Sequence, residues 1–124
     1  MAGLSTDGGA ATVVAAVADL IFGARIRAAA DDAGRALVFA RTPAQLADVA
    51  TGASLVLLDL DARWLDAPAS IRALRGDRAS SGVRIVAFGS HVRTEAIAAA
   101  REAGADRVLA RSAFVKELPA LLAG

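Results

Sequence analysis

The chain has 124 residues, 56% of them hydrophobic and 22% charged, a length and composition that favour one folded domain over a disordered chain. It contains no cysteine and a single histidine, His91, which excludes disulfides, thiolate metal sites and any site with two histidine ligands. The net charge of +1 comes without any run of lysine or arginine, so nucleic acid is not expected as the main partner.

Five short apolar runs predict β-strands, because each is rich in β-branched or leucine side chains and is bounded by polar or turn residues. They cover residues 12–17, 36–40, 54–60, 83–88 and 107–110. The run SLVLLDL at 54–60 gives the strongest strand signal in the chain. Because these strands are apolar throughout and do not alternate with polar residues, they predict a parallel sheet that is covered on both faces.

Segments with helical spacing or capping residues lie between the strands and predict five helices. Gly34 and Gly76 stand at C-terminal positions, and Thr42-Pro43 gives an N-cap followed by proline at the first helical position. The first predicted helix ends at residue 34. The other four cover residues 43 to about 50, 67–76, 97–104 and Phe114 to Leu122.

This alternation predicts an α/β fold, a three-layer, doubly wound sandwich around a five-stranded parallel sheet. The strand order is expected to be flavodoxin-like, with the first strand central. Residues 1–10 are Gly-rich and polar and are expected to form a flexible leader, which leaves 11–124 as a single domain. The longest apolar stretch, at 8–18, is too short to span a bilayer, so a cytoplasmic protein without a membrane partner is expected.

Polar residues follow the carboxyl ends of the predicted strands, where open parallel sheets bind their ligands. They are Asp19 after the first strand, Asp59 and Asp61 at the third, Gly89, Ser90 and His91 after the fourth, and Arg111 with Ser112 after the fifth. A carboxylate at Asp59 could bind a metal ion, accept a phosphoryl group or act as a base. Asp19 could equally be a helix N-cap, Asp61 a turn former and Arg111 a surface residue, and these alternatives stay open.

Over residues 12–122 the chain resembles the receiver domains of bacterial response regulators, which have the CheY-like fold. SLVLLDL resembles the strand that carries the phosphoacceptor aspartate of that family, which places Asp59 at the acceptor position. The segment GADRVLARSAF at 104–114 resembles the family's Gly-Ala-Asp and Lys-Pro-Phe signature, with Arg111 at the position of the lysine. Gly89 falls where the family has its switch threonine or serine, and Ser90 follows immediately.

Four departures from the family pattern fall in the active site that this resemblance implies. Val17 and Ala18 stand at the positions of the two Mg²⁺-binding acids, with Asp19 next to them. Gly89 replaces the switch hydroxyl, and Arg111-Ser112 replaces the Lys-Pro pair. Ala62-Arg63 replaces the Met-Pro that follows the acceptor strand in the family. The resemblance therefore implies a degenerate receiver. In such a receiver Asp19 and Asp59 would hold Mg²⁺ only weakly, in the millimolar range or weaker.

The function expected from these features is that of a single-domain, receiver-like signalling protein that is not an enzyme and acts through protein–protein interaction without efficient phosphorylation. The alternative is a working response regulator, phosphorylated on Asp59 by a histidine kinase partner with Mg²⁺ as cofactor. A second alternative is a small-molecule binder that uses the crevice at the strand ends. We also predict a direct Arg111–Asp59 ion pair, or one bridged by a single water, that holds the site in one state, because arginine forks onto carboxylates bidentately.

The expected interaction face, for a homodimer or a heteromeric contact, consists of the helix after the fourth strand, the fifth strand and the last helix. Its charges are of mixed sign and comprise Arg93, Glu95, Arg101, Glu102, Asp106, Arg107, Lys116 and Glu117. Trp64 could anchor a partner, but its position favours packing over the adjacent helix.

Overall fold

The computed structural model describes residues 12–90 and 94–123, and within these ranges five strands alternate with five helices. In chain order the elements are β1 (Val13–Ala16), α2 (Leu20–Asp32), β2 (Leu37–Phe39), α3 (Pro43–Val49), β3 (Leu55–Asp59), α4 (Ala67–Gly76), β4 (Arg84–Gly89), α5 (Thr94–Ala103), β5 (Arg107–Ala110) and α6 (Arg111–Ala123). The predicted leader at 1–10 lies outside the described residues, and so do His91 and Arg93.

All five strands form one parallel sheet in the order β2-β1-β3-β4-β5, the flavodoxin-like order that the sequence predicts. The expectation that the first strand is central is wrong, because β3 occupies the middle position. The chain places only β2 on one side of β1, and then crosses over to add β3, β4 and β5 in turn on the other side. Accordingly β3 is buried along its whole length, as a strand with neighbours on both sides must be.

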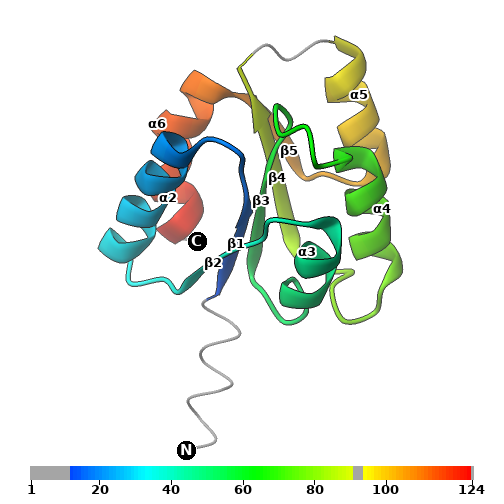
Figure 1. Ribbon diagram of the computed structural model, residues 1–124, viewed down its shortest axis with the longest axis horizontal. Helices are drawn as coiled ribbons and strands as arrows, with labels where there is room; N and C mark the ends of the chain where they lie inside the picture. The colour runs from blue at the N-terminus through cyan, green and yellow to red at the C-terminus, as the bar shows by residue number, and fades with distance from the viewer. Residues whose placement is uncertain (1–11, 91–93, 124) are drawn as a thin grey trace, which may run out of the picture.

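Helices cover both faces of the sheet, with α2 and α6 on one face and α3, α4 and α5 on the other (Figure 1). Each face has its own hydrophobic core, in which alternate residues of the same strand point to opposite layers. On the α2 and α6 face, the rings of Phe22, Phe88 and Phe114 pack together, with the Phe88 and Phe114 centroids 4.1 Å apart. This aromatic cluster forms part of the hydrophobic core between the sheet and helices α2 and α6.

Local signals in the sequence set the ends of several helices as predicted. The Thr42 side chain accepts a hydrogen bond from the Gln45 amide at 3.1 Å, and Pro43 opens α3. Gly34, just beyond α2, has a φ of 69°, a left-handed conformation that glycine adopts without strain. These contacts confirm the capping predictions at both helices.

The last helix begins earlier than its apolar spacing predicts. α6 starts at Arg111, directly after the final residue of β5, whereas the sequence predicts a start at Phe114. The first turn carries polar and small side chains, so it contributes nothing to the hydrophobic periodicity on which the prediction rests. The difference matters because it places Arg111 on a helix and fixes the direction of its side chain.

Gly104 joins α5 to β5 in a conformation that only glycine tolerates well. Its φ is 122°, and a Cβ at this position would stand 2.9 Å from Cγ of Arg75. We expect Gly104→Ala to lower the free energy of unfolding by about 2 kcal/mol, through backbone strain and this overlap. Urea denaturation measures it, with Gly82→Ala as the control because a Cβ there meets nothing within 4 Å. Equal effects of the two substitutions would contradict the prediction.

Candidate functional site

Asp59 ends β3 with its carboxylate buried at the carboxyl edge of the sheet. Its side chain is only 1% exposed. Oδ1 accepts a hydrogen bond from the Asp61 amide at 2.9 Å, and Oδ2 accepts one from the Ala18 amide at 3.3 Å. Backbone amides from two loops therefore stabilise the negative charge of Asp59, which is otherwise costly to bury.

Arg111 is the cation of this site, and three carboxylates surround it. Its guanidinium lies 3.7 Å from Oδ2 of Asp19, 3.9 Å from Oδ2 of Asp59 and 3.7 Å from Oδ2 of Asp61. The predicted ion pair with Asp59 is thus present. The predicted bidentate fork is not, because the guanidinium is shared among three acids and all three distances exceed those of hydrogen bonds.

Packing also fixes the position of Arg111. The guanidinium carbon lies 4.5 Å from the centroid of the Phe22 ring, a cation–π contact with the aromatic cluster below. The side chain is 28% exposed. Its Nε atom is buried and has no hydrogen-bond partner in the described part of the chain. Arg111 is therefore held by shared charge and ring contact, without directional hydrogen bonds.

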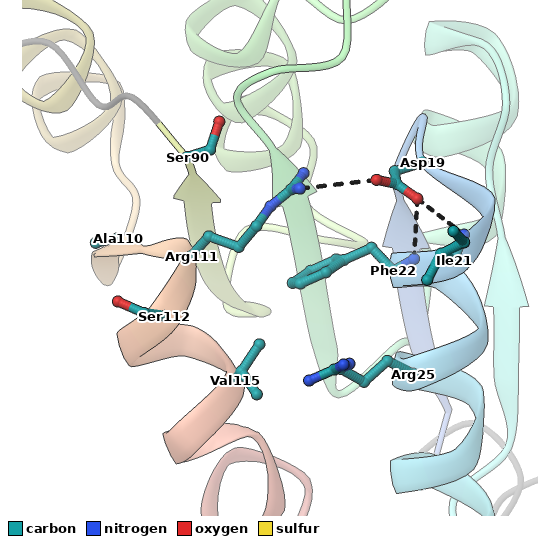
Figure 2. Close-up of a pocket in the computed structure, with 9 residues that line it drawn as sticks. All are labelled: Asp19, Ile21, Phe22, Arg25, Ser90, Ala110, Arg111, Ser112 and Val115. Carbon is teal, nitrogen blue, oxygen red and sulfur yellow. Dashed lines mark hydrogen bonds and ion pairs between the residues drawn. The ribbon is translucent and has the colours of Figure 1, made fainter.

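Asp19 is the helix N-cap that the sequence offers as one alternative, and it also faces Arg111. It is the N-cap of α2, since Oδ1 accepts hydrogen bonds from the amides of Ile21 at 2.8 Å and Phe22 at 3.1 Å. Its other oxygen, Oδ2, faces Arg111 (Figure 2). The two capping hydrogen bonds hold the carboxylate at the start of the helix through Oδ1. Oδ2 can therefore face the Arg111 guanidinium while the cap stays intact.

A hydrogen-bonded latch between Asp61 and Ser90 is the feature that sequence reasoning missed. Oδ2 of Asp61 accepts two hydrogen bonds from Ser90, from Oγ at 2.7 Å and from the amide at 2.8 Å. The Ser90 hydroxyl thus binds Asp61 and not Asp59, and Gly89 contributes no side chain. The parallel register pairs Asp59 with Phe88, so continuing it by two residues would bring Asp61 opposite Ser90.

A divalent cation does not fit these side chains as they stand. Asp59 is engaged by two amides, Asp19 caps a helix and Asp61 binds Ser90, which leaves each carboxylate with an existing partner. A guanidinium already lies within 4 Å of all three and offsets part of their negative charge, which weakens their attraction for a second cation. Among residues 12–90 and 94–123, no group of three or more acidic or histidine side chains is arranged to hold a metal ion.

Several charges of the predicted interaction face are paired within the chain. Arg107 of β5 binds Glu117 of α6 through two hydrogen bonds, and this contact lowers the pKa of Glu117 and raises the pKa of Arg107. Asp106 pairs with Arg75 of α4 at 2.9 Å. These charges therefore hold the chain's own elements together.

Trp64 is half-buried and packs against the core on the α3, α4 and α5 face. This contact agrees with its packing interpretation. In the ranges that the structure describes, no helix has the length and apolar character needed to cross a bilayer.

No family model matches the sequence, and no curated protein matches it. Solved structures do match, over nine tenths of the chain. A response regulator from Hahella chejuensis is 21% identical with a TM-score of 0.78, covering 90% of this chain and 91% of that one. The receiver domain of the sensor histidine kinase PA1611 from Pseudomonas aeruginosa, with magnesium coordinated in its active-site cleft, is 18% identical with a TM-score of 0.77, covering 90% and 93%.

The phosphorylated cyanobacterial phytochrome response regulator RcpA is also similar, at 14% identity and a TM-score of 0.74, covering 91% of this chain and 89% of that one. At these identities the likeness is one of fold. The chain therefore has the receiver fold of response regulators, as the strand order and the resemblance in sequence both predict.

Proposed function

We propose that this chain is a receiver-like signalling module that works through protein–protein contact and is not efficiently phosphorylated. The observation that carries the proposal is the position of Arg111, whose guanidinium lies within 4 Å of Asp19, Asp59 and Asp61. Arg111 supplies in permanent form a positive charge that offsets part of the charge of these three acids, so the site depends less on a bound metal ion.

The burial of Asp59 supports the same conclusion. Phosphoryl transfer requires an accessible acceptor oxygen and positive charge that is positioned to neutralise the transferred group. Asp59 is 1% exposed, and both of its oxygens accept backbone hydrogen bonds. The Pseudomonas receiver domain holds magnesium in its cleft, whereas here a guanidinium lies among the acids. We therefore propose that Mg²⁺ binds no more tightly than the millimolar range.

The Asp61–Ser90 latch ties two loops of the module together. It joins the loop after β3 to the end of β4, and Arg111 joins both to the start of α6. The face formed by α5, β5 and α6 begins at these same loops. We propose that a partner protein, or a second copy of the chain, recognises this face in one fixed state and requires no phosphoryl signal.

Phosphorylation by a small-molecule donor tests the proposal. We expect intact-protein mass spectrometry to show no added phosphoryl group after incubation of the full chain with acetyl phosphate and Mg²⁺, because Asp59 is buried and Arg111 fills its surroundings. The same incubation with beryllofluoride should leave amide NMR signals near Asp59 unmoved.

The matched control is Asp59→Asn, which removes the acceptor while keeping the shape of the side chain. A phosphoryl adduct on the wild-type chain that disappears in Asp59→Asn would contradict the proposal. That outcome would favour the alternative function, a response regulator with Asp59 as its phosphoacceptor, for which a histidine kinase would be the expected donor.

A further inference from the structure

A cavity of about 510 Å³ lies between α2 and α6, beside the acidic cluster (Figure 2). Its volume falls within the range of roughly 300–1,000 Å³ that is typical of small-molecule sites. Nine residues line it, namely Asp19, Ile21, Phe22, Arg25, Ser90, Ala110, Arg111, Ser112 and Val115. Asp19, Ser90 and Arg111 also belong to the acidic site, whereas the signalling role proposed above makes no use of the remaining lining residues.

The two guanidinium groups of the cavity differ in how they are engaged. Arg111 is surrounded by the three carboxylates of the site, whose negative charge exceeds its own positive charge. Arg25 forms no ion pair or hydrogen bond with any of the residues that the structure describes. Figure 2 shows its side chain reaching from α2 towards Val115 on α6, away from Asp19. Arg25 therefore brings an unbalanced positive charge to the end of the cavity furthest from the acids.

The walls on either side of Arg25 are apolar. Phe22 and Val115 line the interior, and Ile21 stands at the mouth with 80% of its surface exposed. Ile21 and the neighbouring Leu20 are the most exposed large hydrophobic residues in the described part of the chain. Exposed apolar side chains beside a hollow mark a surface that gains free energy when a ligand covers it.

We propose that this cavity binds a small anionic amphiphile, a molecule with a carboxylate, sulfonate or phosphate head and an apolar body. The head pairs with Arg25, since the acids around Arg111 repel an anion at the opposite end. The body packs against Ile21, Phe22 and Val115, where it removes apolar surface from water. Such a ligand would contact Arg111 and α6 without reaching the buried Asp59, so the proposal stands or falls independently of phosphorylation.

Binding of the aromatic sulfonate 8-anilinonaphthalene-1-sulfonate to the full chain tests the proposal by fluorescence. The neutral analogue N-phenyl-1-naphthylamine has the same apolar body without the charged head. We expect the sulfonate to bind saturably, and Arg25→Ala to weaken it about fivefold, the effect of losing one partly exposed ion pair. Arg27→Ala is the matched control, because Arg27 lies on the same helix over the Phe39 ring and does not line this cavity. It should leave the affinity unchanged.

Two further measurements complete the test. Val115→Trp places a larger side chain in the cavity and should weaken binding of both dyes, while circular dichroism shows whether each variant keeps the wild-type fold and Tm. Binding of the neutral dye should be equal in the wild-type chain and in Arg25→Ala. No saturable binding of the sulfonate, equal loss in Arg25→Ala and Arg27→Ala, or undiminished binding in a folded Val115→Trp variant would each overturn the proposal.

Discussion

Replacing Arg111 with alanine is expected to lower the free energy of unfolding by about 2 kcal/mol, which is a fall in Tm of about 8 °C for a chain of this length. The substitution leaves the buried Asp59 carboxylate without its nearby cation and exposes it to repulsion from Asp19 and Asp61. The cost is below that of a fully buried pair because Arg111 is 28% exposed and its contacts exceed hydrogen-bond length. Urea denaturation measures this loss.

Arg107→Ala is the matched control, since it removes an arginine whose ion pair with Glu117 is exposed. It should change stability by no more than about 0.5 kcal/mol. The double variant Arg111→Ala with Asp59→Asn should recover part of the loss, because the unpaired buried charge is gone. An Arg111→Ala effect as small as that of Arg107→Ala would show that the three carboxylates do not depend on Arg111.

Millimolar Mg²⁺ should raise the Tm of the Arg111→Ala variant more than that of the wild-type chain. Removing the guanidinium leaves three carboxylates without a cation, and a divalent ion that binds them stabilises the folded state by mass action. An equal response of the two chains would contradict the interpretation that Arg111 occupies the place of a metal ion.

Arg75→Ala is expected to cost about 3 kcal/mol of unfolding free energy, the largest effect of any single arginine in the described part of the chain. Arg75 donates hydrogen bonds to the carbonyls of Ser81, Val83 and Gly104 and to the Asp106 carboxylate. Without it, partly buried carbonyls from two separate loops lose their donors, and α4 loses its tie to the segment before β5.

Arg72→Ala on the same helix is the control, because its side chain is exposed and takes part in no hydrogen bond or ion pair with the described residues. Thermal unfolding followed by circular dichroism should separate the two variants by about 10 °C. Similar Tm values for both would show that water replaces Arg75 at these carbonyls without cost.

Much of the fold could be predicted from the sequence because its signals are local. A short apolar run such as SLVLLDL, bounded by polar and turn residues, favours a strand buried on both faces, and the structure buries all of β3. Thr42-Pro43 predicts the start of α3 because capping needs only residues that are neighbours in sequence. The parallel topology then brings Asp59 and Arg111 to one edge, since the carboxyl ends of all strands meet there.

The tertiary structure alone decided how the residues at that edge are joined. The sequence predicted a pair between Arg111 and Asp59, whereas the fold shares one guanidinium among three acids, because α6 begins at Arg111 and directs its side chain over Phe22. Arg75 forms hydrogen bonds with loops up to 31 residues away, and no periodic pattern in the sequence predicts these contacts. Periodicity and capping act within an element, but hydrogen bonds between elements depend on where each loop lies once the core has packed.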